Sequence, residues 1–163
     1  MNSIQNTAAT ATENVRFDDK VNIAYTQTRI HKPEQSLLKQ NRILCSDSPS
    51  KWLESYRMLR TRCMQQMDAM EWKTVAITST SGGSGNSLTA VNLAISVAME
   101  LDRTALLVDA NLRNPSIDRL FGIKADAGLS DYLLNDKEIS SMLVNPGVER
   151  LVVLPAGQPL INA

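Results

Sequence analysis

A glycine-rich loop between an expected strand and an expected helix constrains this chain more than any other feature. The β-branched run Thr74–Thr78 is typical of a buried strand, three glycines fall in the loop 79–85, and Ser87 opens a mostly apolar helix. Such a junction suits a phosphate group, because free backbone N–H groups and the positive end of the helix converge there. The usual phosphate-loop pattern places Lys after the last glycine, but this chain has Asn86.

Composition narrows the class of protein. The length of 163 residues suits one domain, and 17 basic residues balance 17 acidic ones, so no overall field favours a nucleic-acid partner. No run reaches the roughly 18 apolar residues of a membrane span, and the polar N-terminus does not resemble a signal peptide. We expect Cys45 and Cys63 to be reduced thiols of a cytoplasmic protein, and His31 to lie at the surface.

A second apolar strand, expected at 104–109, ends in the carboxylate of Asp109. Two strands joined by a helix predict a right-handed βαβ unit in a parallel sheet. Ligands of such sheets bind beyond the carboxyl ends of the strands, so we expect Asp109 to lie at the same edge as the loop. Short helices are predicted from Pro115 to Phe121, over 128–134 and over 136–144, with Gly122 ending the first and a third strand at 151–154.

The first 47 residues are poor in residues that build a core, and we treat 1–47 as a flexible leader. Two apolar islands, Val21–Tyr25 and Asn41–Leu44, can instead lie against the body as extended arms. The sequence supports both interpretations.

An amphipathic helix is predicted from Ser48 to Met70, within a segment 48–72 that precedes the main domain at 73–163. Its apolar stripe, expected to pack on the core, consists of Trp52, Tyr56, Leu59, Cys63, Met67 and Met70. Glu54, Arg57 and Arg60 lie away from this stripe. They form either a solvated face or an interface between subunits, and spacing alone leaves both open.

Four sequence blocks together resemble the bacterial tyrosine kinases of exopolysaccharide biosynthesis, relatives of the partitioning-type P-loop ATPases. ESYRMLR at 54–60 matches the family's E-x-x-R-x-x-R, and TSTSGGSGNSLTAVNLA at 78–94 lies over its Walker A loop and helix. LLVDANLRNPS at 106–116 lies over its second acidic motif, D-x-D-x-R. GLSDYL and LVVLPAG match two further blocks in the family's order. The resemblance implies an α/β fold, part of a P-loop NTPase, with a parallel sheet flanked by helices.

The resemblance also implies a chemistry and its partners. It implies ATP and Mg²⁺ as cofactors, autophosphorylation of tyrosines between subunits, and a membrane polysaccharide chain-length (co-polymerase) partner that would bring a cytoplasmic kinase to the membrane. The implied interface residues are Glu54, Arg57 and Arg60. The implied nucleotide-binding residues are Gly82, Gly83, Ser84, Gly85, Asn86, Ser87 and Leu88, with Ser87 and Asp109 at the metal.

Three departures from the family pattern bear on catalysis. Asn86 replaces the Walker A lysine and brings no positive charge to the β- and γ-phosphates. Asn111 replaces the second carboxylate and cannot act as a base, although Asp109 remains. The family's Walker B strand and tyrosine-rich tail are absent from these 163 residues. A truncated product, a fragment and a subunit completed by a partner are all consistent with this. A sheet without its later strands is expected to have an open apolar edge unless something covers it.

Three functions remain as hypotheses. The first is an ATP-dependent tyrosine kinase, a transferase with impaired catalysis. The second is a non-catalytic pseudoenzyme that binds nucleotide or joins active kinase subunits. The third is a partitioning-type ATPase, which is disfavoured because such relatives carry an early signature lysine where this loop has Ser81.

Overall fold

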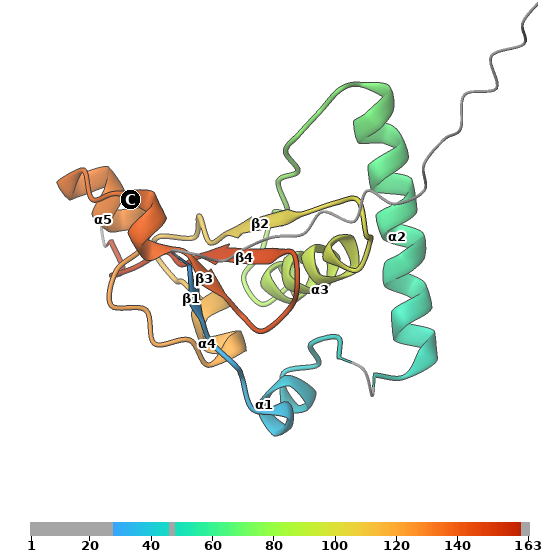
Figure 1. The fold of residues 1–163 in the computed structure, drawn as a ribbon, viewed down its shortest axis with the longest axis horizontal. Helices are drawn as coiled ribbons and strands as arrows, with labels where there is room; N and C mark the ends of the chain where they lie inside the picture. Colours follow the sequence, from blue (N-terminus) through green and yellow to red (C-terminus); the bar gives the residue numbers. More distant parts are fainter. Residues whose placement is uncertain (1–27, 46–47, 161–163) are drawn as a thin grey trace, which may run out of the picture.

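A four-stranded sheet with helices packed around it forms the body of the chain in the computed structural model, which describes residues 28–45 and 48–160 (Figure 1). The strands are β1 (Arg29–Ile30), β2 (Ala105–Val108), β3 (Val144–Asn145) and β4 (Leu151–Leu154), in the order β1-β3-β4-β2. β2 runs parallel to β4 and β1 parallel to β3, whereas β3 and β4 are antiparallel through Val144 and Val153. The sheet is therefore mixed: two of its strand pairs are parallel, as expected for an α/β fold flanked by helices, and the pair β3–β4 is antiparallel.

The run before the glycine loop does not enter the sheet. Residues 74–78 form no strand, and Val75 is 45% exposed, so the prediction of a buried strand there was wrong. The run has the right side chains for a strand, but a strand also needs a neighbouring backbone edge. In the described part of the chain no strand pairs with it.

The helices agree more closely with expectation. They are α1 (Gln35–Gln40), α2 (Ser50–Ala69), α3 (Asn86–Ala98), α4 (Ile117–Phe121), α5 (Leu129–Asn135) and the 3₁₀ helix η1 (Ile139–Met142). Gly122 ends α4 as predicted, because its φ of 68° is a conformation that glycine adopts without steric cost. The helix predicted over 136–144 is only the single turn η1, and Val144 belongs to β3.

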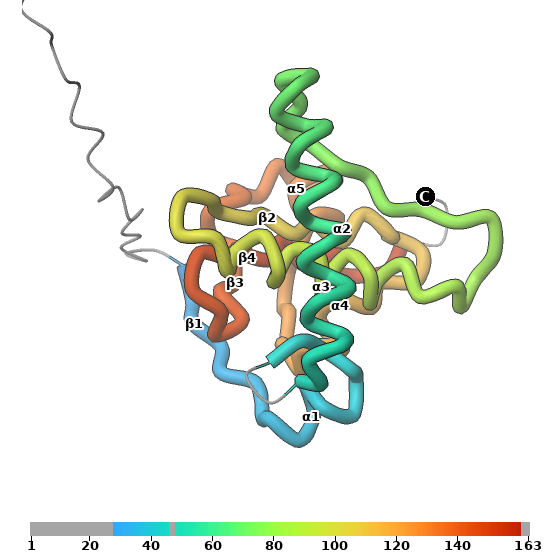
Figure 2. The backbone as a smooth tube through the Cα atoms, turned by 90° about the vertical axis from the view of Figure 1, so that its right-hand side faces the viewer, coloured from blue at the N-terminus to red at the C-terminus, as the bar shows by residue number. Residues whose placement is uncertain are grey.

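The core lies between the sheet, α3 and α4. Its buried side chains are Ile43, Leu44, Val91, Ile95, Ala98, Leu107, Ile117, Phe121, Ile123, Val144, Leu151 and Val153. α3 packs directly on β2 and β4, and α2 lies along the outer side of α3 (Figures 1 and 2). This stacking fixes the start of α3 at one end of the sheet, which is what positions the glycine loop.

The apolar side chains of α2 are less buried than the sequence pattern predicts. None of its residues is buried, and Trp52, Leu59 and Met70 are 42%, 37% and 52% exposed. Only Leu53 and Tyr56 of this helix pack against the core cluster, both half-buried. The helix begins after Pro49 rather than after Ser48. Ser48 instead accepts a hydrogen bond from the Cys45 N–H group, 2.9 Å away.

Part of the segment expected to be a leader is built into the fold. Residues 28–45 supply β1 and α1 and place Ile43 and Leu44 in the core, with exposed fractions of 2% and 3%. The interpretation of the second apolar island as an arm against the body is therefore confirmed. Val21–Tyr25 and the rest of the expected leader lie outside the described residues.

β2 forms one edge of the described sheet, and its outward-facing side chains are uncovered. Leu107 points into the core and is 8% exposed, whereas Leu106 and Val108 are 58% and 39% exposed. β2 therefore lies at an open edge of the described sheet, and the sheet face that carries Leu106 and Val108 is uncovered. A search of the described helices finds none that is both long and apolar enough to cross a membrane.

Candidate functional site

The glycine loop precedes α3 with two residues in the left-handed region. Gly83 has φ 75° and Gly85, the N-cap of α3, has φ 83°. A Cβ atom at either position would meet nothing within 4 Å, so the need for glycine is conformational rather than steric. Because the N–H groups of a helix's first turn have no carbonyl partner within the helix, those of Asn86, Ser87 and Leu88 can bind an anion.

Hydroxyl groups stabilise the loop from within. Ser79 and Ser84 each donate to the Ser81 carbonyl at 2.8 Å, and the hydroxyls of Ser81 and Ser84 lie 2.8 Å apart. The Asn86 side-chain amide donates to the Ser79 hydroxyl at 2.7 Å. Asn86 therefore closes the loop at its base. It supplies no charge there.

Asp109 lies at the same end of the sheet as the loop, as its position after a strand predicts. Its carboxylate is 3% exposed and accepts N–H groups from Asn111, Ser116 and Ile117 at 3.1, 2.9 and 3.0 Å. The Ser116 hydroxyl in turn lies 2.7 Å from the hydroxyl of Ser87, in the first turn of α3. The two residues expected at a metal, Ser87 and Asp109, are thus linked through Ser116, which sequence reasoning did not single out.

Asn111 belongs to the loop after β2 and takes part in its turns. Its N–H group donates to Asp109, and its side-chain oxygen accepts the Asn114 N–H group at 3.2 Å. The residue itself is exposed. The position of the family's second carboxylate is therefore held by a neutral amide that stabilises the loop.

The donor set at this end of the sheet fits a magnesium ion held together with a phosphate chain. Ser87 and Asp109 offer a hydroxyl and a carboxylate, and hard oxygen ligands of this kind suit Mg²⁺. In such sites one or two carboxylates suffice, since phosphate oxygens and water fill the remaining positions. The described residues contain no group of three or more His, Cys, Asp or Glu side chains that could hold a metal ion, so Asp109 would need phosphate and water as the further ligands.

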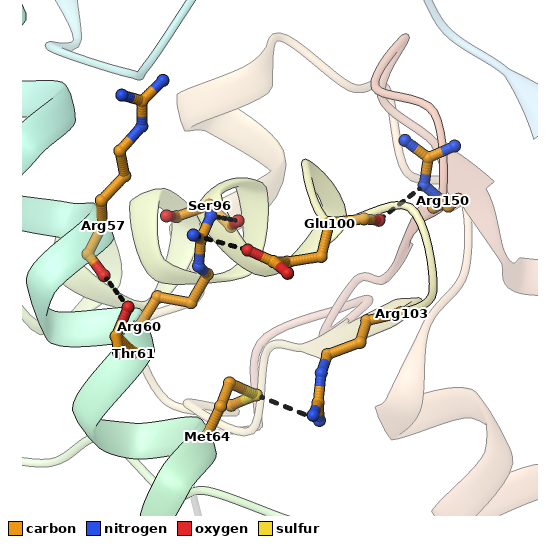
Figure 3. A network of polar contacts seen from close by, with 8 residues as sticks. All are labelled: Arg57, Arg60, Thr61, Met64, Ser96, Glu100, Arg103 and Arg150. Atoms are coloured by element: carbon orange, nitrogen blue, oxygen red, sulfur yellow. Dashed lines mark hydrogen bonds and ion pairs between the residues drawn. The ribbon is translucent and has the colours of Figure 1, made fainter. Parts of the chain in front are cut away.

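The far end of α3 is capped by two arginines (Figure 3). Arg60 of α2 donates to the Ser96 carbonyl at 2.9 Å and forms an ion pair with Glu100 at 2.5 Å. Arg150 donates to the carbonyls of Ala98 and Glu100 at 3.2 and 3.0 Å. Because the last carbonyls of a helix lack partners within it and carry partial negative charge, both guanidinium groups stabilise α3.

The three charged residues expected at a subunit interface differ in their surroundings. Arg60 is half-buried and bound to α3, with a side chain 16% exposed. Glu54 and Arg57 lie on the exposed part of α2, and Figure 3 shows the Arg57 side chain directed away from the Arg60 contacts. Within the described residues Glu54 and Arg57 therefore remain available to a second chain.

A second ion pair joins α2 to the turn before β2. Arg103 forms two hydrogen bonds with the Asp68 carboxylate, at 3.2 and 2.7 Å, and also contacts the Met64 sulfur. The hydrogen bond from Arg103 lowers the pKa of Asp68 below its usual value, and the same bond raises the pKa of Arg103. Both groups face solvent, so this pair contributes orientation more than stability.

Sequence comparison relates this chain to kinases. The ParA family model, described as NUBPL iron-transfer P-loop NTPase, matches residues 72–149. The tyrosine-protein kinase YwqD of Bacillus subtilis is 31% identical over 128 residues, which are 78% of this chain and 54% of YwqD. The tyrosine-protein kinase CpsD of Streptococcus agalactiae is 34% identical over 106 residues, 64% of this chain and 45% of CpsD. The chain thus spans about half the length of these curated relatives.

A further relative is named for a role other than that of a kinase. The antiactivator FleN of Pseudomonas aeruginosa is 33% identical over 96 residues, 58% of this chain and 34% of FleN.

Among solved structures, the BceF tyrosine kinase domain superposes with a TM-score of 0.66 at 26% identity. That superposition covers 83% of this chain and 58% of the BceF domain.

Proposed function

Because this chain is a homologue of the bacterial tyrosine kinases with a ParA-like P-loop NTPase fold, we propose that its glycine loop binds ATP together with Mg²⁺. The observation that carries the proposal is the contact between the Ser87 and Ser116 hydroxyls, 2.7 Å apart. It brings the first turn of α3, where N–H groups are free, next to the buried carboxylate of Asp109. A phosphate chain and a cation need these two kinds of group side by side.

In this proposal, backbone N–H groups bind the phosphates, and a hydroxyl with a carboxylate binds the metal. The N–H groups of the loop and the first turn surround the phosphates, through Gly82, Gly83, Ser84, Gly85, Asn86, Ser87 and Leu88. The Ser87 hydroxyl and the Asp109 carboxylate hold the metal, directly or through water. Mg²⁺, when bound, neutralises charge on the phosphate oxygens.

Phosphoryl transfer by this chain is weak or absent in our proposal. Asn86 is neutral, and its amide is already bonded to Ser79. Loss of one charged group that stabilises a transition state costs on the order of 3 kcal/mol, or about a hundredfold in rate. Asn111 adds to this deficit, since an amide cannot accept the proton of a tyrosine hydroxyl.

Two measurements test the proposal. The first is a titration with a fluorescent ATP analogue, once in Mg²⁺ and once in EDTA, and the second is detection of phosphotyrosine. We expect the wild-type chain to bind the analogue and to form little phosphotyrosine. Asn86→Lys should bind more tightly, and Asn86→Lys with Asn111→Asp should give the strongest phosphotyrosine signal. Absence of binding by both the wild type and Asn86→Lys would reject the nucleotide site. Robust autophosphorylation by the wild type would reject the impairment.

A second function, as a non-catalytic subunit of active kinases, is favoured by the exposed charges of α2. Glu54 and Arg57 are both exposed, and Figure 3 shows the Arg57 side chain directed away from the Arg60 contacts, so both residues can pair with another chain. YwqD and CpsD are tyrosine-protein kinases, and on the resemblance to that family we propose that this chain works in the cytoplasm beside a membrane co-polymerase. The interface is tested by measuring the mass of the oligomer in solution for the wild type and for Arg57→Ala. An unchanged mass would reject the interface.

A partitioning-type ATPase is the least favoured function. FleN and the ParA family match show that this fold serves other roles. The loop nevertheless has Ser81 where the signature lysine of such ATPases is expected, and the Ser81 hydroxyl is bonded within the loop.

A further inference from the structure

We propose that Ser116 is a positioning residue of the magnesium–nucleotide site, where it holds the Ser87 hydroxyl beside the Asp109 carboxylate. The inference rests on the proposed function and assigns a role that neither the glycine loop nor the acidic motif predicts. Two contacts carry it. The Ser116 N–H group donates to Asp109 Oδ2 at 2.9 Å, and its hydroxyl lies 2.7 Å from that of Ser87.

The Ser116 hydroxyl is not used for the role its position suggests. Ser116 is the N-cap of α4, where a serine side chain usually accepts an N–H group of the first turn. Here the side chain makes no capping bond. The N–H group of Ile117 binds the Asp109 carboxylate instead, at 3.0 Å. The hydroxyl is therefore available for Ser87, in another helix.

Asp109 cannot adjust its own position toward a cation. A carboxylate offers about four lone-pair sites, and three of them are taken by N–H groups of Asn111, Ser116 and Ile117. One site on Oδ1 remains for a metal or its water. Three N–H groups of the segment 111–117 hold the carboxylate in place. The distance from Asp109 to Ser87 therefore depends on Ser116, which contacts both.

Within the described residues, Ser116 forms hydrogen bonds with both Ser87 and Asp109. Mg²⁺ requires near-ideal octahedral geometry and tolerates little displacement of its ligands. Residues that orient metal ligands without binding the metal typically change its affinity by about tenfold to a hundredfold when removed. Loss of the Ser116 hydroxyl should thus weaken the site for magnesium and leave the phosphate contacts of the loop intact.

The experiment measures binding of the fluorescent ATP analogue as a function of Mg²⁺ concentration and, separately, in EDTA. Ser116→Ala should raise the Mg²⁺ concentration needed for half-maximal enhancement of binding by about tenfold or more. Its affinity in EDTA and its midpoint of thermal unfolding should equal those of the wild type. Ser116→Thr keeps the hydroxyl and should restore the wild-type requirement for Mg²⁺.

Ser130→Ala is the matched control, because Ser130 is a buried serine near the start of a short helix and its hydroxyl has no hydrogen-bond partner. It should leave the Mg²⁺ dependence unchanged. An equal Mg²⁺ requirement for wild type and Ser116→Ala would overturn the inference. So would an equal loss of affinity in EDTA, or failure of Ser116→Thr to restore binding. Lack of binding by the wild type itself, with and without Mg²⁺, would instead overturn the nucleotide site as a whole.

Discussion

The Nη2 atom of Arg60 lies 2.5 Å from Oε1 of Glu100, and this contact joins the middle of α2 to the second residue after the end of α3. The same guanidinium group donates to the Ser96 carbonyl. An arginine that its sequence motif predicts at an interface between subunits therefore stabilises its own chain. The interface role stays a prediction, so the effect of a variant of Arg60 on association must be compared with its effect on stability.

Arg60→Ala should lower the free energy of unfolding by about 1–2 kcal/mol, since it removes an ion pair and a charged hydrogen bond at a helix C-terminus. Urea unfolding of the purified chain measures this. Arg57→Ala is the control, because the Arg57 side chain points away from these contacts, and it should change stability by less than about 0.5 kcal/mol. Equal losses for both variants would contradict the intramolecular role of Arg60.

Gly85→Ala should destabilise the chain by about 1–2 kcal/mol and weaken nucleotide binding, because an L-residue at φ 83° is strained. Gly82→Ala provides the comparison. Gly82 has no positive φ and an added Cβ atom there meets nothing within 4 Å, so stability should remain near that of the wild type. Thermal unfolding and binding of the ATP analogue check both variants, and an unaffected Gly85→Ala would show that the loop adopts another conformation.

Adjacent positions of β2 should respond in opposite ways. Leu106 is 58% exposed, so Leu106→Gln should leave stability nearly unchanged and reduce association of the chain at high concentration, measured by light scattering. Leu107 is 8% exposed, and Leu107→Ala should cost about 2–4 kcal/mol through loss of packing. A large loss of stability from Leu106→Gln would indicate that this face is covered.

The ion pair of Asp68 and Arg103 predicts a pH dependence. The pKa of Asp68 is lowered in the folded chain from a usual value of 3.8, chiefly by the hydrogen bond from Arg103. Its contribution to stability is therefore fully present above the unfolded pKa and is lost as the pH falls through the lower folded pKa. Asp68→Asn should thus be slightly less stable than wild type at pH 7, and the difference should vanish in strong acid. Unfolding in urea across this range measures it, and a difference that grows toward acid would contradict the sign.

Sequence patterns predict the two longer strands, miss the two-residue strands β1 and β3, and predict one strand that does not form. Ala105–Val108 and Leu151–Leu154 pair with each other and form where expected. The run 74–78 has an equally strong strand pattern and remains unpaired. Side-chain periodicity reports the suitability of a segment for a sheet, but it carries no information about which backbone edge is present.

The candidate site was predictable in outline only. The position of Asp109 at the end of a strand placed it at the loop's edge of the sheet, and the structure agrees. Ser116 was not predictable, because a serine before a short helix suggests an N-cap and its contact with Ser87 depends on how two helices meet. Arg60 was missed as a helix cap for the same reason, since its partners lie in another helix.

The pairing of β1 with β3 has a consequence for synthesis of the chain. Arg29 pairs with Val144, so β1 leaves the ribosome long before the strand that it joins. Contacts between segments so far apart in sequence form slowly, because the intervening chain must first be brought into order. β1 therefore stays unpaired until β3 has been translated. During that interval its backbone N–H and C=O groups are accessible to a chaperone that binds extended segments.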